Sequence, residues 1–113
     1  MSGRVVALLG WPVAHSLSPA IHRAAYAALG LPWDYVCLAV KPRHLADAVR
    51  DLARDRRIRG ANVTIPHKRA VLDLAPPATP AVAAVGAANT LVRGPDGGFV
   101  AHNPQGRTAD IGK

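Results

Sequence analysis

The stretch "IRGANVTIPHK", residues 58–68, decides the fold class of this 113-residue chain. Residues 58–65 predict a β-strand, and Pro66 then suits the first turn of a short helix predicted over 66–75. An amphipathic helix, predicted over 42–57, comes directly before the strand. A strand between two helices is typical of a sheet whose parallel strands are joined by right-handed helical crossovers.

The same alternation extends toward the N-terminus. Short apolar runs predict buried strands over 4–10 and 34–40, with a helix over 18–30 between them. Ser18 is a good N-cap for this helix, and Gly30 is a good C-terminal cap. Apolar periodicity predicts the helical residues that face the core: Ile21, Ala25, Ala28 and Leu29 in the first helix, and Leu45, Ala48, Val49 and Leu52 in the second.

The C-terminal part of the chain predicts antiparallel pairing. After a proline-rich start, residues 76–87 predict a short Ala/Val helix that Gly86 ends. Residues 89–94 and 98–103 flank a Pro-Asp-Gly turn and predict a β-hairpin. A hairpin beside parallel strands makes the sheet mixed.

We therefore expect an α/β fold: a single three-layer domain with a mostly parallel, mixed sheet and flanking helices. The expected domain spans residues 1–103. Residues 104–113 match no helix or strand pattern, and we expect them to form an atypical C-terminal tail.

Composition argues against several classes of protein. No run approaches the ~20 apolar residues that a membrane-spanning helix needs, and the single cysteine, Cys37, favours a reducing, cytoplasmic setting. The formal net charge of +7 is compatible with nucleic acid or small-anion partners. However, the densest basic segment, residues 50–59, contains Asp51 and Asp55 and has no aromatic residue for base stacking. We therefore expect no nucleic acid partner and no membrane.

The histidines show no spacing typical of metal ligands, so we expect no metal site. We expect surface or pocket-rim positions for all five of them: His15, His22, His44, His67 and His102.

Polar side chains gather after the predicted strands. In α/β sheets, ligands bind outside the carboxyl ends of the strands. The segments that follow the first and third strands, and the turn at 86–90, bring hydroxyls, amides and one ammonium group toward that edge. The candidate site residues are Ser16, Ser18, Asn62, Thr64, Lys68 and Asn89.

These groups suit a small hydroxylated carboxylic acid. Serine hydroxyls near a helix N-terminus can donate to a carboxylate, asparagine amides suit vicinal hydroxyls, and Lys68 can exchange a proton with an alcohol or carbonyl oxygen. Each residue also has an ordinary structural role. Ser18 can be only an N-cap, Asn62 and Thr64 can bond loop backbone, and a lone lysine is usually solvated.

Three segments together resemble a known family. "GWPVAHSLSPAIH" (10–22), "GANVTIPHK" (60–68) and "GAANT" (86–90) look like the signature segments of the N-terminal substrate-binding domain of shikimate dehydrogenases, including quinate-using members. The match is ordered and spans about positions 5–103.

The resemblance implies a role for each candidate residue. By this resemblance, Ser16 and Ser18 bind the substrate carboxylate, while Thr64 and Lys68 line the pocket and Lys68 is the catalytic group. The remaining two are asparagines: Asn62, which lies beside the site, and Asn89, which contacts the ring hydroxyls. The implied substrate is shikimate or 3-dehydroshikimate, with NADP(H) as the hydride partner. The residues leave shikimate, quinate and amino analogues undistinguished.

Two features depart from the family pattern. Where the family has Asn-Thr-Asp, with an aspartate that works with the lysine, this chain has Asn103, Pro104 and Gln105. No G-x-G-x-x-G segment is present, so we expect no cofactor-binding residue and no nucleotide-binding domain in this chain. We therefore expect a truncated relative that binds substrate without catalysing the reaction alone and that self-associates through uncovered apolar surface. The alternative is a non-catalytic binding or sensor module for shikimate-like or quinate-like acids.

Overall fold

The computed structural model describes residues 3–13 and 18–104. Its centre is a five-stranded sheet in the order β2-β1-β3-β4-β5. The strands are β1 (Val5–Gly10), β2 (Asp34–Ala39), β3 (Ile58–Val63), β4 (Thr90–Arg93) and β5 (Phe99–His102). The α-helices are α1 (Ser18–Ala28), α2 (Leu45–Arg54) and α3 (Pro80–Val85), and 3-10 turns are η1 (Pro42–His44) and η2 (Ala70–Asp73).

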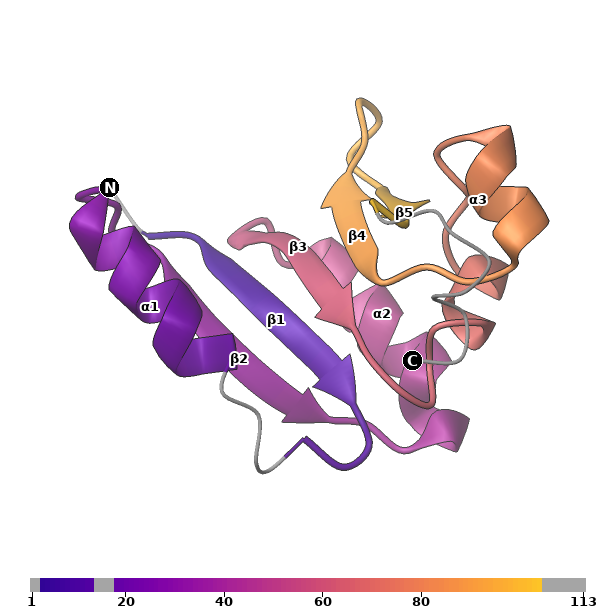
Figure 1. The fold of residues 1–113 in the computed structure, drawn as a ribbon, viewed down its shortest axis with the longest axis horizontal. Helices are drawn as coiled ribbons and strands as arrows, with labels where there is room; N and C mark the ends of the chain where they lie inside the picture. The colour runs from indigo at the N-terminus through magenta and orange to yellow at the C-terminus, as the bar shows by residue number, and fades with distance from the viewer. Residues whose placement is uncertain (1–2, 14–17, 105–113) are drawn as a thin grey trace.

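The pairing of the strands confirms the mixed α/β sheet. β1 pairs in parallel with both β2 and β3, whereas β3 with β4, and β4 with β5, pair antiparallel. α1 and α2 lie on opposite faces of the sheet, which gives three layers (Figure 1). The boundary between residues 1–103 and a tail at 104–113 stays a prediction, because the description ends at residue 104.

The main core lies between the sheet and α2. Alternate residues of β1, such as Ala7 and Leu9, are fully buried there, and Leu45 and Val49 of α2 pack on them as the periodicity predicts. The opposite face carries a smaller cluster with α1, whose buried members are Leu8, Val13 and Tyr35. The sheet is therefore covered much more completely on its α2 face.

The prediction for the buried face of α1 is wrong. Ile21 is 64% exposed and Leu29 is 72% exposed, although both belong to the predicted inward face. The helix instead turns His22 and Tyr26 toward the sheet, where the His22 ring stacks on Tyr35 with centroids 4.1 Å apart. Aromatic contacts decide the orientation, because α1 carries apolar residues on more than one side.

The helix predicted over 66–75 is also wrong, since the structure has only the 3-10 turn η2 there. The Lys68 carbonyl accepts the N–H of Ala88 (2.8 Å), a residue from another segment. An α-helix would need that carbonyl for Leu72, whose N–H donates to Arg69 instead (3.2 Å). The segment is thus shaped by a long-range hydrogen bond that local propensity does not reveal.

His67 is a further correction, because it is neither at the surface nor on a pocket rim. Its side chain is 1% exposed, and its Nε2 lies 2.6 Å from the carbonyl oxygen of Val40, just after β2. A buried imidazole needs such a partner. His67 therefore ties the segment after β3 to the end of β2.

The remaining elements follow the sequence closely. Thr79 caps α3 by accepting the N–H of Val82 (3.3 Å), and Gly86 ends the helix at φ 75°. The β4–β5 hairpin forms as predicted, with Arg93 opposite Phe99. No helix within residues 3–13 and 18–104 is long and apolar enough to span a membrane.

Candidate functional site

One edge of the sheet collects the predicted polar residues. The parallel strands β1, β2 and β3 all end there, and their arrowheads point the same way in Figure 1. The antiparallel strand β4 starts at this edge, since Thr90 pairs with Asn62, and β5 ends there, since His102 pairs with Thr90. Residues that follow β1, β3 and β5, or precede β4, therefore meet at one place.

Asn62 lies near the end of β3, with a half-buried side chain. The hydroxyl of Tyr35 donates to its Oδ1 at 2.8 Å. Because the amide oxygen is engaged, the amide nitrogen is the part of the side chain left to meet a ligand. Asn62 is thus held as a hydrogen-bond donor.

Thr64 is locked onto the end of β1. Its N–H donates to the Leu9 carbonyl (2.9 Å), and its carbonyl accepts the N–H of His67 (3.0 Å). The Thr64 methyl group packs directly against Gly10, and a Cβ on Gly10 would lie 2.4 Å from Thr64 Cγ2. A glycine is required at the end of β1 for this close approach.

Lys68 is placed by its backbone. Its carbonyl accepts the N–H of Ala88 (2.8 Å), so Lys68 lies beside the segment that leads into Asn89. Lys68 is half-buried. A half-buried cation at the carboxyl edge can attract an anionic ligand.

Asn89 bridges the ends of two strands through its backbone. Its carbonyl accepts the N–H of Val63 (2.8 Å), and its N–H donates to the carbonyl of His102 (3.1 Å). The hydroxyl of Thr90 donates to Asn89 Oδ1 at 2.9 Å. As at Asn62, the amide oxygen is engaged and the amide nitrogen remains for a ligand.

The structure thus brings together four of the six candidate residues: Asn62, Thr64, Lys68 and Asn89. Ser16 lies outside the described residues. Ser18 is the first residue of α1, but the structure does not describe its side chain. Asn103 follows β5 at the same edge, where its Nδ2 donates to the Ala87 carbonyl (3.3 Å).

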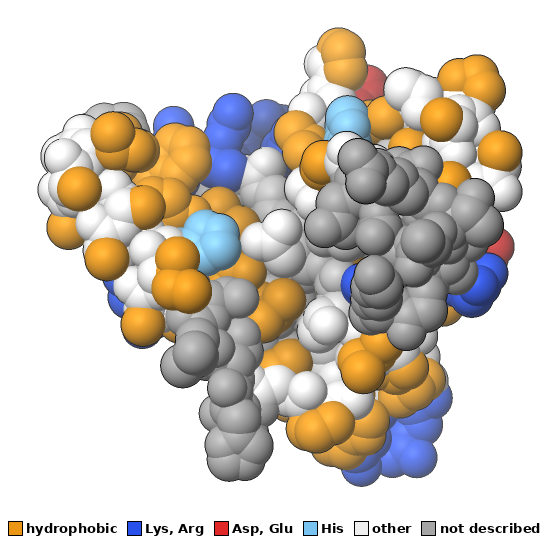
Figure 2. Space-filling model, viewed as in Figure 1, with side chains coloured by type: hydrophobic (Ala, Val, Ile, Leu, Met, Phe, Trp, Pro, Cys, Tyr) orange, Lys and Arg blue, Asp and Glu red, His pale blue; other side chains and the backbone are white. Residues whose placement is uncertain are grey.

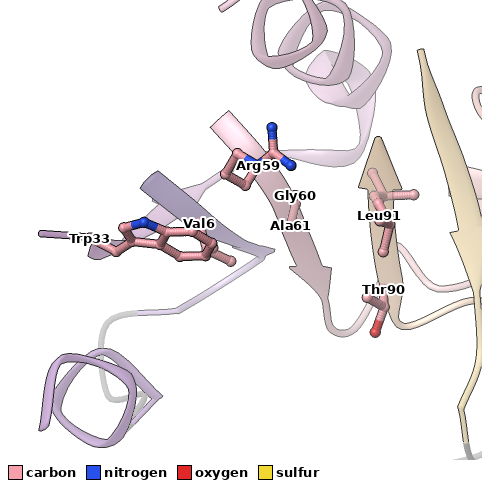
Figure 3. A pocket seen from close by; sticks show the side chains of 8 residues that line it. Val6, Trp33, Arg59, Gly60, Ala61, Thr90 and Leu91 are labelled. Atoms are coloured by element: carbon pink, nitrogen blue, oxygen red, sulfur yellow. The ribbon is translucent and has the colours of Figure 1, made fainter. Parts of the chain in front are cut away.

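An open cavity of about 310 Å³ lies over β1, β3 and β4, where Thr90 belongs to this edge, whereas Val6 and Arg59 lie toward the starts of their strands. Trp33 and Thr90 stand on opposite sides of it, with Gly60 of β3 between them and Arg59 on the rim (Figure 3). Figure 2 shows hydrophobic side chains over α1 and around the hollow between α1 and β4. Thr90 therefore belongs both to the polar edge and to a largely apolar cavity.

Sequence reasoning missed three contributors to the site. Tyr35 and Thr90 hold the two asparagine amides, and His67 anchors the turn that carries Thr64 and Lys68. The apolar run in residues 34–40 marks Tyr35 as part of a buried strand, but nothing in it reveals that the hydroxyl of Tyr35 reaches β3. Among residues 3–13 and 18–104, no cluster of His, Cys, Asp or Glu could hold a metal ion.

Comparisons with known proteins agree with this arrangement. Residues 8–91 match the family model described as shikimate dehydrogenase substrate binding domain. A shikimate dehydrogenase (NADP(+)) from Synechococcus sp. is 51% identical over 102 residues, which cover 90% of this chain and 35% of that protein. The chain thus spans about a third of the length of this relative.

Solved structures with the same fold include a shikimate 5-dehydrogenase from Listeria monocytogenes in complex with shikimate and NAD. It is 35% identical, with a TM-score of 0.81 over 88% of this chain and 34% of that one. A ligand-free 5-ketofructose reductase of Gluconobacter sp. is 29% identical, with a TM-score of 0.83 over 91% of this chain and 36% of that one.

Proposed function

This chain belongs to the shikimate dehydrogenase substrate-binding domain family, and from that premise we propose that it binds shikimate or 3-dehydroshikimate at the carboxyl edge of its sheet. One observation carries the proposal: Asn62, Thr64 and Lys68 from residues 60–68 and Asn89 from residues 86–90 converge at that edge. We propose that the domain extends over residues 1–103, beyond the matched residues 8–91.

The chemistry of the edge supports a polyhydroxylated acid. Asn62 and Asn89 each offer an amide N–H₂ group, because a neighbouring hydroxyl occupies each amide oxygen. Such donors suit the oxygens of ring hydroxyls. Lys68 adds a positive charge, which complements a carboxylate or an oxyanion.

Two further roles complete the proposed site. We assign the substrate carboxylate to Ser16 and Ser18, at the start of α1, where a helix N-terminus favours an anion. We assign proton transfer with the reacting alcohol or carbonyl oxygen to Lys68.

NADP is the cofactor named for the Synechococcus relative, and we propose it as the hydride partner of the whole enzyme's reaction. The turn after β1 does not fit a dinucleotide, however. A pyrophosphate needs open backbone there, whereas a Cβ on Gly10 would lie 2.4 Å from Thr64 Cγ2 and 2.6 Å from Val13 Cγ1. Side chains fill the space, so we assign no described residue to NADP.

A second candidate function is binding without catalysis, as in a sensor for shikimate-like or quinate-like acids. It is favoured by Gln105, which stands where the family pattern has an aspartate that works with the lysine. Spectrophotometry of the purified chain with shikimate and NADP tests an expectation that both candidates share, namely that this chain alone does not reduce NADP. NADP reduction that follows the protein through purification would contradict both.

We also propose that the chain self-associates through its uncovered apolar surface. Ile21, Leu29 and Val92 are 64%, 72% and 42% exposed, and the cavity beside β4 is lined mainly by apolar groups. Exposed apolar surface of this kind favours association. Light scattering should show a mass that rises with concentration, whereas a constant monomer mass would contradict the proposal.

We place the protein in the cytoplasm, where the free thiol of Cys37 would stay reduced.

A titration of the ¹⁵N-labelled chain with shikimate tests the binding proposal. Chemical-shift changes should cluster on residues 15–18, 62–68 and 89–90. We expect weak affinity, on the order of millimolar, or about 4 kcal/mol. Titration with sulfate is the control for charge alone. Changes confined to the Arg-rich segment 50–59, and reproduced by sulfate, would contradict a shikimate site.

A further inference from the structure

A hydrogen bond from Tyr35 orients the side-chain amide of Asn62. Tyr35 is fully buried, and a buried phenol hydroxyl needs a hydrogen-bond partner. That partner is Asn62 Oδ1, at 2.8 Å. Rotating the amide by half a turn would place an N–H₂ group against the hydroxyl and withdraw the donor from the edge.

Tyr35 reaches Asn62 across the strand that separates them. Tyr35 lies on β2, opposite Val6 of β1, and Val6 lies opposite Gly60 of β3, two residues before Asn62. The two residues are therefore separated by two strand spacings of about 4.8 Å each. The Tyr35 ring packs in one cluster with Leu8 of β1, which places its hydroxyl near β3. The tyrosine side chain is long enough to span this gap, and its hydroxyl lies at the far end.

The Tyr35 ring is itself fixed from the side of α1. His22 stacks on it with centroids 4.1 Å apart and an interplanar angle of 17°. His22 lies one helical turn after Ser18, the first residue of α1. A continuous set of contacts therefore links the start of α1, through two stacked rings, to the amide of Asn62.

We propose that Tyr35 is a positioning residue of the ligand site: its hydroxyl holds the Asn62 amide with the oxygen inward, so that the N–H₂ group is presented to an oxygen atom of the ligand. The ligand itself rests on the proposed function, but the orientation of the amide does not. Thr90 holds Asn89 in the same way, so both asparagines act as donors. The site then selects a ligand rich in acceptor oxygens.

Tyr35→Phe tests the proposal with little disturbance, because the ring and its stacking on His22 remain. Tyr26→Phe is the matched control, since it removes the same atom from a neighbouring ring of the α1 cluster. In the free chain, the side-chain ¹⁵N–¹H₂ resonances of Asn62 should move in Tyr35→Phe and stay in place in Tyr26→Phe. Unmoved resonances in Tyr35→Phe would overturn the proposal whether or not shikimate binds.

Shikimate affinity provides the second readout. The dissociation constant should rise about three- to tenfold in Tyr35→Phe, the size of one net hydrogen bond. In the Asn62→Ala background, the same change should have less than about a twofold effect, because Tyr35 then has no amide to hold. A purely structural role would weaken binding equally in both backgrounds, and that result would overturn the proposal.

Asn62→Asp gives a test that leaves Tyr35 in place. A carboxylate can still accept the Tyr35 hydroxyl, but it offers the ligand an oxygen in place of N–H₂. We expect the thermal midpoint to stay near that of the wild type and shikimate binding to fall at least about tenfold. Undiminished binding would show that Asn62 is not required as a donor. If the wild type itself fails to bind shikimate, the proposed function is wrong, and the resonance test still decides the role of Tyr35.

Discussion

Replacing Arg93 by methionine should destabilise the fold much more than the same replacement of Arg54, an exposed arginine. The guanidinium of Arg93, on β4, donates five hydrogen bonds to backbone carbonyls. Three acceptors lie at the end of α2, one starts β3 and one lies in the hairpin turn. They are Leu52 (3.2 Å), Ala53 (2.8 Å), Asp55 (2.6 Å), Ile58 (2.8 Å) and Gly97 (2.7 Å). Arg93 thus fastens α2 and β3 to the hairpin that carries Thr90.

The expected loss follows from these contacts. A net hydrogen bond contributes about 1 kcal/mol, so five contribute about 5 kcal/mol. Arg93 is half-buried, and water can replace part of that set, which lowers the expected loss to about 3 kcal/mol. Burial is also the main reason why the pKa of Arg93 is lowered, ahead of repulsion from Arg56 and Arg59. Domains of this size are stable by only about 5–15 kcal/mol, so the change is large.

Urea denaturation followed by circular dichroism measures the effect. Arg54→Met is the matched control, because Arg54 is an exposed arginine at the end of α2. It should change the free energy of unfolding by less than about 0.5 kcal/mol. Arg93→Lys should recover only part of the loss, since one ammonium group cannot reach the same set of acceptors. Equal stabilities of Arg93→Met and Arg54→Met would refute this reasoning.

Three other substitutions, in two experiments, have defined outcomes. Gly60→Ala should lower the free energy of unfolding by about 3 kcal/mol, because the new Cβ would lie 2.5 Å from the Leu91 carbonyl oxygen. Gly97→Ala should lower it by only about 1 kcal/mol, because Gly97 has a φ of +90° but no atom close to the new Cβ. Equal losses of unfolding free energy in Gly60→Ala and Gly97→Ala, measured by urea denaturation, would contradict the packing argument. Hydrogen bonds from Arg57 lower the pKa of Asp55 from 3.8 to about 2. The stabilisation from Asp55 is therefore present above about pH 4 and is lost as pH falls toward 2. The thermal midpoint of Asp55→Asn should fall less steeply than that of the wild type over this pH range. Equal slopes in the two proteins would contradict this.

The sequence predicts elements whose pattern depends on local chemistry. The strands predicted over 4–10 and 58–65 form as β1 and β3, and Gly86 ends α3 in the left-handed conformation that glycine favours. The convergence of Asn62, Lys68 and Asn89 also follows from the predicted order of elements, because the antiparallel strand β4 starts at the edge where β3 ends. Their assignment as site residues rests on that topology and on three short segments.

Features that depend on distant contacts could not be predicted in this way. Helix propensity favours residues 66–75 as a helix, but the carbonyl of Lys68 bonds Ala88 from another segment. The orientation of α1 is decided by His22 on Tyr35, an aromatic contact that hydrophobic periodicity does not count. The burial of His67 depends on the Val40 carbonyl, 27 residues away. Each of these is a tertiary contact that overrides a local preference.

The dissociation constant of shikimate for Lys68→Ala, measured beside wild type and Arg54→Ala, tests the central claim most directly. Arg54 is exposed at the end of α2, just before β3 starts and therefore at the opposite edge of the sheet, and it is the control for loss of one positive charge. Removing a charge-assisted hydrogen bond costs about 1.5–3 kcal/mol, so Lys68→Ala should weaken binding at least about tenfold while Arg54→Ala stays within about twofold of wild type. Equal affinities in Lys68→Ala, Arg54→Ala and wild type would contradict a shikimate site at this edge of the sheet.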